Sequence, residues 1–180
     1  MRRRITVLSL GLILSCVVLS AQSRTPSADD TAAPTIVYVV RHAEKASDAP
    51  DADLSSSGRI RAQVLTWMMR DIELQAVYST NVSRTMNTVS PVAKAKGLNI
   101  THYQARPSKL AAIIRNEHIG KSVLICGHSN TIPGLLSELG CPIEETVLGG
   151  FDDLFVVILT RDSAGEIKAV LQRLHYPAKR

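Results

Sequence analysis

Two histidines and two arginines lie at the ends of apolar runs, where functional residues of α/β proteins gather. Arg41 and His42 follow the first run of the chain without a gap, and His128 follows a later run after a single glycine. Arg84 comes shortly after a third run, in the first turn of an expected helix. The functional crevice of an open α/β sheet lies outside the carboxyl ends of its strands. We therefore expect these four side chains to meet at one edge of a sheet.

A cluster of this composition is suited to phosphoryl transfer. Guanidinium groups bind phosphate oxygens in a bidentate manner, and free backbone N–H groups at 129–131 would add donors where a helix is expected to begin. A neutral imidazole is also a nucleophile toward phosphorus. We expect His42 to attack the phosphorus and His128 to stabilise the charge of the transition state. Arg41 and Arg84 would hold the phosphate oxygens.

Segments with strand and helix patterns alternate along most of the chain. The expected strands are 36–40, 76–79, 98–102 and 122–126, and the expected helices are 55–70, 82–96, 108–115 and 130–139. This alternation predicts a three-layer α/β sandwich with a mostly parallel central sheet and helices on both faces. The runs 154–160 and 167–174 predict a C-terminal antiparallel hairpin at the edge of the sheet. Trp67 and Met69 are expected to be core or packing residues.

At these positions the sequence resembles the histidine phosphatase superfamily, also called the phosphoglycerate mutase-like family. The similar segments are VVRHAEK, DLSSSGRIRA, VYSTNVSRTMNT and ICGHSNTIP, in this order between about residues 36 and 140. The resemblance implies that His42 is the phosphorylated residue and that Arg41, Arg84 and His128 complete the pocket. It also implies that the enzyme needs neither a metal nor an organic cofactor. The chain would be a short, exported member of the family.

The general acid that family members usually supply has no obvious counterpart. The segment HYQARPSKLAA, which follows the second arginine, carries no carboxylate, and Ser129 follows His128 where some members have Asp. Glu44 is the tentative acid because it lies in the same loop as His42. The alternatives are Asp152, Asp153 or no acid at all, since phosphohistidine, acyl phosphates and anhydrides have good leaving groups.

These carboxylates also have purely structural alternatives. Glu44 would then orient Arg41 or pair with Lys45, and Asp152 would cap the turn at 149–151. The leading function is a phosphatase acting on a small phosphate ester or anhydride. The alternatives are a catalytically weak phosphate-binding or interaction module and a phosphohistidine phosphatase, the latter disfavoured by export.

The N-terminal segment has the features of a secretory signal. Residues 1–23 combine three arginines, an apolar stretch and small residues before Arg24, which predicts cleavage and export to the periplasm or the extracellular space without a remaining membrane span. Lipid anchoring at Cys16 is the minor alternative. Residues 24–34 are expected to be a flexible tether and 35–180 the catalytic domain.

Composition excludes some other classes of protein. The chain has 21 Lys+Arg and 16 Asp+Glu, and the signal holds three of the arginines, so the mature protein is nearly neutral and lacks the footprint of a nucleic-acid binder. We expect no metal, because the two histidines lack partners at ligand spacing. Cys126 and Cys141 are expected to be buried thiols rather than a disulfide. The sequence gives no prediction of oligomeric state.

Overall fold

The computed structural model describes residues 33–143 and 150–178, so the predictions for the signal, for Cys16 and for the tether up to residue 32 lie outside the described residues. Four helices and six strands alternate as expected until the chain ends in two consecutive strands. The strands are β1 (Thr35–Arg41), β2 (Leu74–Ser79), β3 (Ile100–His102), β4 (Ser122–Gly127), β5 (Asp153–Arg161) and β6 (Ile167–His175). The helices are α1 (Ser56–Met68), α2 (Ser83–Lys96), α3 (Pro107–Glu117) and α4 (Ile132–Glu138).

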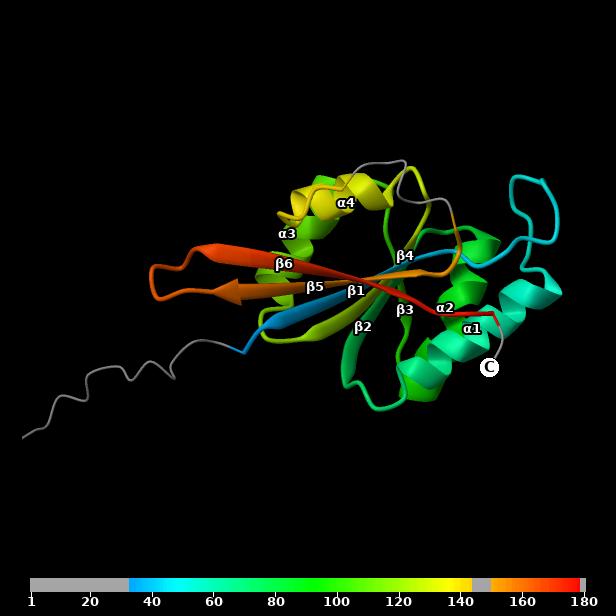
Figure 1. Cartoon of the computed structure of the whole chain (residues 1–180), viewed down its shortest axis with the longest axis horizontal. Helices are drawn as coiled ribbons and strands as arrows, with labels where there is room; N and C mark the ends of the chain where they lie inside the picture. The colour runs from blue at the N-terminus through cyan, green and yellow to red at the C-terminus, as the bar shows by residue number, and fades with distance from the viewer. Residues whose placement is uncertain (1–32, 144–149, 179–180) are drawn as a thin grey trace, which may run out of the picture. The chain divides into compact units, whose positions relative to one another are not determined.

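The six strands form one sheet in the order β3-β2-β4-β1-β5-β6 (Figure 1). The strands β3, β2, β4 and β1 are parallel to one another, whereas β5 is antiparallel to β1 and β6 is antiparallel to β5. The predicted α/β sandwich with a C-terminal antiparallel hairpin is therefore confirmed. Among the described residues, no helix is long and apolar enough to cross a membrane.

Two hydrophobic clusters fill the space between the sheet and its helices. One cluster joins α1 and α2 to one face of the sheet, and the other joins α3 and α4 to the opposite face. Cys126 and Cys141 are buried in these clusters as free thiols, as predicted. Figure 1 shows the two helix pairs on opposite sides of the strands.

Several element boundaries differ from the expected ones for local reasons. The third strand begins only at Ile100, because the N–H of Leu98 is used to close α2 by donating to Ala93 O behind the left-handed Gly97 (φ 65°). The fourth helix begins at Ile132 rather than at residue 130, because the preceding turn folds back onto His128 O.

Of the two residues expected to be core or packing residues, Met69 belongs to the core, whereas Trp67 packs at the surface. Met69 follows α1 and is 1% exposed, whereas Trp67 is 47% exposed. The cause is the direction of the side chains around the helix, because Leu65 is buried and Trp67 lies about 200° further around at 3.6 residues per turn. Trp67 packs instead against Arg70, whose guanidinium lies 4.3 Å from the ring centroid.

Candidate active site

The register of β1 and β4 brings His42 and His128 together. Arg41 pairs with Gly127 across the two parallel strands, and the N–H of His42 donates to Gly127 O at 3.0 Å. The two imidazole rings that follow lie with their centroids 5.4 Å apart. The sequence prediction that both histidines reach one edge of the sheet is consistent with this geometry.

His42 is held in one tautomer by its own backbone. Its Nδ1 lies 2.8 Å from Ala43 O, and because a carbonyl only accepts, Nδ1 must carry the proton. The lone pair is therefore on Nε2. Burial lowers the pKa of His42 to about 4, and the positive charges of Arg41, His128 and Arg84 add to this effect against the opposing hydrogen bond to Ala43. At neutral pH the ring is therefore neutral.

His128 is fixed by contacts on both ring nitrogens. Its Nδ1 lies 3.5 Å from Nη2 of Arg84, which only donates, so Nδ1 accepts and Nε2–H donates to Thr80 Oγ1 at 2.9 Å. Its backbone N–H donates to Thr131 Oγ1. Burial, followed by Arg84 and Arg41, lowers the pKa of His128 as well.

The two arginines approach the histidines from different elements. Arg84 stands in the first turn of α2, where Nη1 donates to Pro50 O at 2.7 Å. Arg41 ends β1, with Nη1 3.4 Å from Gly150 O and its guanidinium carbon 4.3 Å from the ring centroid of Phe151. Burial and the charge of Arg84 lower the pKa of Arg41. The four residues predicted from the sequence thus lie near one another.

One backbone N–H group that was expected to bind phosphate is already hydrogen-bonded. The N–H of Thr131 donates to His128 O inside the turn before α4, as does that of Ile132. The prediction that the backbone N–H groups up to Thr131 are free for phosphate is therefore wrong for Thr131. The turn instead orients His128.

Two contributors were missed by sequence analysis. Phe151 lies with its ring centroid 5.6 Å from that of His42 and also covers Arg41. Thr80 accepts from His128 and lies 2.9 Å from Thr85 Oγ1. Thr80 had a signal, since it is a polar residue directly after β2. Phe151 had none, because only the fold brings residue 151 back to residue 41.

Glu44 contacts neither of the partners expected for it. Its carboxylate binds Arg61 of α1, with Nη2 at 2.6 Å and Nε at 3.0 and 3.1 Å, and Nη1 of Arg61 donates to Tyr176 O. Lys45 pairs with Asp48 instead. Burial tends to raise the pKa of Glu44, but the hydrogen bonds from Arg61 outweigh it, and the pKa is lowered. The structural role expected for Glu44 beside Arg41 or Lys45 is therefore replaced by an ion pair with Arg61.

The other two candidate acids have different surroundings. Asp153 is fully buried and accepts from Nε of Arg173 at 2.6 Å. The side chain of Asp152 is 45% exposed and lies 3.4 Å from Nδ1 of His175. Asp152 therefore reaches solvent beside the crevice, whereas Asp153 does not.

Asp152, Asp153 and His175 also form a group with the composition of a metal site. Their ligand atoms lie within 4.8 Å of one another. Arg173 already neutralises the carboxylate of Asp153, and the charge of Arg41 acts on the same group. A cation would have to compete with two guanidinium groups, so we assign no metal here.

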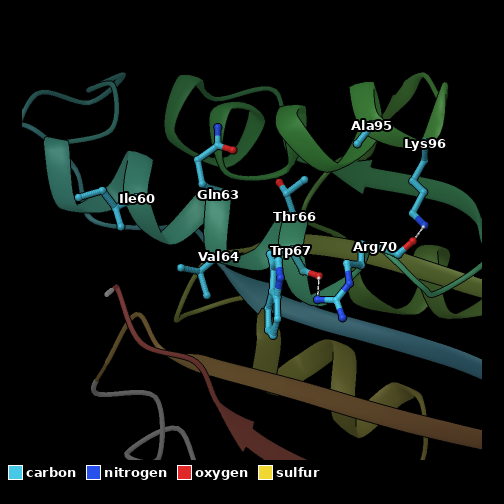
Figure 2. Close-up of a pocket in the computed structure, with 8 residues that line it drawn as sticks. All are labelled: Ile60, Gln63, Val64, Thr66, Trp67, Arg70, Ala95 and Lys96. Carbon is cyan, nitrogen blue, oxygen red and sulfur yellow. Dashed lines mark hydrogen bonds between the residues drawn. The ribbon is translucent and has the colours of Figure 1, made fainter. Parts of the chain in front are cut away.

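A separate groove of ≈ 630 Å³ lies on the outer side of α1 and α2. Figure 2 shows Val64 and Trp67 projecting from one side of α1 and Gln63 from the other. The groove is lined by Ile60, Gln63, Val64, Thr66, Trp67, Arg70, Ala95 and Lys96. It contains none of the predicted catalytic residues.

Comparison with known proteins finds similarity in one segment of the sequence and in the fold. The family model of the histidine phosphatase superfamily (branch 1) matches residues 37–105, a segment that includes Arg41, His42 and Arg84. Comparison with curated proteins gives no matching sequence.

Solved structures share the fold at low identity. A mycobacterial glucosyl-3-phosphoglycerate phosphatase is 14% identical with a TM-score of 0.65, covering 79% of this chain and 99% of its own. A putative phosphohistidine phosphatase, SixA from Agrobacterium tumefaciens, is 23% identical with a TM-score of 0.55, covering 78% and 97%. YhfR from Bacillus stearothermophilus is 17% identical with a TM-score of 0.61, covering 77% and 96%. The chain is thus similar to the histidine phosphatase superfamily over residues 37–105, and it shares its fold with these solved structures.

Proposed function

We propose that the protein is a metal-independent phosphatase that transfers a phosphoryl group to Nε2 of His42 and then to water. The observation that carries this proposal is the state of His42. Its Nδ1–H is held by Ala43 O, its pKa is lowered to about 4, and two arginines adjoin it. A neutral imidazole with a fixed lone pair is ready to attack without losing a proton first.

In the first step, Nε2 of His42 attacks phosphorus and the bond to the leaving oxygen breaks. Arg41 and Arg84 would bind the equatorial oxygens through their terminal nitrogens. The phosphate would displace the 3.5 Å contact between Arg84 and His128, so that both groups face the developing charge. In the second step, water attacks phosphorus, the N–P bond breaks, and inorganic phosphate leaves with His42 restored as a neutral ring.

The leaving group decides whether the first step needs an acid. An alkoxide must take a proton as it departs, whereas a carboxylate or a phosphate can leave as an anion. The ion pair with Arg61 favours a charged Glu44, and Asp153 is buried beside Arg173. Of the three candidates, the exposed Asp152 is the one best placed to exchange protons with solvent. We therefore favour substrates with good leaving groups, such as anhydrides or acyl phosphates.

A phosphohistidine phosphatase is the second candidate. The lack of a carboxylate at 103–106 and the pairing of Glu44 with Arg61 support a substrate that does not depend on a strong protein acid. Two solved structures with this fold are titled as putative phosphohistidine phosphatases, at 23% and 19% identity. We further propose that the protein is exported, because residues 1–23 have the pattern of a signal. Export separates the protein from cytoplasmic phosphorelays and leaves this candidate second.

The test compares leaving groups in the presence of excess chelator. The chain from Arg24 onward would be assayed with acetyl phosphate, p-nitrophenyl phosphate and a simple alkyl phosphate, beside His42→Ala. We expect turnover of the first two substrates, little turnover of the third, and an acid-labile phosphoryl group on His42 after rapid quenching. Phosphate binding without turnover of any substrate would support the binding module instead, and activity retained by His42→Ala would exclude the phosphohistidine mechanism.

A further inference from the structure

Arg41 has a buried nitrogen for which the structure shows no partner among the described residues. Its Nη1 reaches Gly150 O at 3.4 Å and its flat face lies on Phe151, but Nε is buried and makes no hydrogen bond. Buried N–H groups of guanidinium are almost always paired, and an unpaired one deserves an explanation. The terminal nitrogens are the ones that a phosphate would take.

Asp153 has the complementary feature. It is fully buried, and its Oδ1 accepts from Arg173 at 2.6 Å with Nδ1 of His175 at 3.4 Å. Its Oδ2 is buried and makes no hydrogen bond. Residues of β6 therefore contact Oδ1 of the carboxylate, and Oδ2 remains without a hydrogen bond among the described residues.

The strand register places these two unpaired atoms on facing residues. Val40 pairs with Leu154 across the antiparallel strands β1 and β5, so the next pair toward the crevice is Arg41 and Asp153. Side chains of directly opposed residues share a face of the sheet, about 5 Å apart at Cβ. The negative charge of Asp153 also raises the pKa of Arg41 against the effect of burial, as expected of groups that interact.

We propose that Asp153 is the positioning residue of Arg41, accepting Nε–H on Oδ2 while the terminal nitrogens bind the phosphate. This inference rests on the proposed function, because it assigns Arg41 to the phosphate. Arg173 and His175 of β6 contact Asp153, so the β5–β6 hairpin would fix the position of Arg41 at the phosphate site. The arrangement would also give β6 a role in positioning Arg41, because Arg173 and His175 of this strand contact Asp153.

The test measures binding of inorganic phosphate by calorimetry, together with kcat and KM for an activated ester. Asp153→Asn keeps the shape of the side chain and the bond from Arg173 but removes the charge. We expect it to weaken phosphate binding and kcat/KM by about tenfold to a hundredfold, because displacing a binding group by about 1 Å has effects of this size. Asp71→Asn makes the same change of charge on an exposed side chain that pairs with Arg70, far from the histidines along the strands, and should change both values less than about twofold.

The Arg41→Lys background distinguishes a positioning role of Asp153 from a purely structural one. Lysine has no Nε–H to anchor, so Asp153→Asn should change phosphate affinity by less than about twofold in the Arg41→Lys background. Equal losses in both backgrounds, or an Asp153→Asn protein that binds phosphate like Asp71→Asn, would overturn the inference. Thermal unfolding of each variant separates a loss of fold from a loss of positioning. If the unchanged protein binds no phosphate and turns over no ester, the proposed function fails instead.

Discussion

The crevice at the carboxyl ends of the strands and the groove on α1 and α2 each contain two cationic side chains, but these side chains have different partners. In the groove, Arg70 pairs with Asp71 at 3.0 Å and stacks on Trp67, and Lys96 donates to Arg70 O. In the crevice, Arg41 and Arg84 each bind a carbonyl oxygen, and Arg84 also lies 3.5 Å from Nδ1 of His128. A guanidinium already paired with a carboxylate has fewer free N–H donors and a partly neutralised charge, so it binds a phosphate more weakly.

The two regions also differ in what positions their side chains. The groove is built from neighbouring turns of two helices, so its composition follows from local sequence. The crevice collects residues from β1, β4, α2 and the segment before β5. Its electrostatic character therefore depends on the whole sheet. Convergence of positive charge on two histidines, rather than the size of a hollow, distinguishes the proposed active site from the groove.

The largest expected effect comes from removing a crevice arginine. Arg84→Ala should lower kcat/KM for an activated phosphate ester by about 10²- to 10³-fold, the usual effect of deleting one donor that stabilises transition-state charge. Arg70→Ala is the matched change in the groove, and kcat/KM should stay within about twofold of the unchanged enzyme. Steady-state kinetics of both variants check the comparison. Similar losses in the two variants would show that the groove takes part in catalysis.

The sequence was sufficient for the parts of the crevice that follow parallel strands. His42, Arg84 and His128 come directly or shortly after strand patterns, and parallel strands bring such positions to one edge. The contacts of Phe151 with Arg41 and of Arg61 with Tyr176 could not be predicted in this way. They join residues 110 and 115 positions apart, and their formation depends on how the hairpin and the C-terminus fold back. The exposure of Trp67 could not be predicted, because helical spacing shows only that a helix has an apolar face. It does not show which apolar residues at the margin of that face remain exposed to solvent.

The second prediction concerns the pH dependence of the crevice. The pKa of His42 is lowered to about 4, so the ring stays neutral and nucleophilic as the pH falls through 6.5 and becomes protonated only near pH 4. We expect kcat/KM to be nearly constant from pH 7 to pH 5 and to fall about tenfold per pH unit below pH 4. A histidine with its ordinary pKa of about 6.5 would already lose roughly thirtyfold at pH 5.

The same shift predicts a direction for stability. Because the pKa is lower in the folded state, the unfolded chain binds more protons between pH 6.5 and 4, and His42 makes the protein less stable as the pH falls through this window. His42→Asn should remove this part of the pH dependence of the free energy of unfolding. NMR titration of the His42 ring measures the pKa directly. A midpoint near 6.5 would contradict the proposed neutral nucleophile.

The third prediction tests the contact between α1 and the loop of the nucleophile. A Cβ at Gly58 would lie 2.2 Å from the backbone oxygen of Glu44, two residues after His42. Gly58→Ala should therefore destabilise the protein by about 1–3 kcal/mol and lower kcat several-fold, because the loop must shift to admit the methyl group.

Gly97→Ala is the control for stability alone. Gly97 has a positive φ with nothing within 4 Å of the added Cβ, so the substitution should cost about 1–2 kcal/mol and leave kcat unchanged. Chemical denaturation and kinetics of both variants separate strain from displacement of the loop. Equal kcat values in the two variants would show that the Gly58 contact does not position His42.

The smallest effect is expected at the most exposed aromatic side chain of the groove. Trp67→Ala removes a ring that is 47% exposed and packs on Arg70, so kcat/KM should stay within about twofold and the free energy of unfolding should fall by less than about 1 kcal/mol. Because Trp67 is the one tryptophan of the sequence, its fluorescence also reports on the groove directly. Adding inorganic phosphate to the unchanged protein should leave this fluorescence constant, since Trp67 lies outside the crevice. A change on phosphate binding would show that the two regions are coupled, and the groove would then belong to the description of the active enzyme.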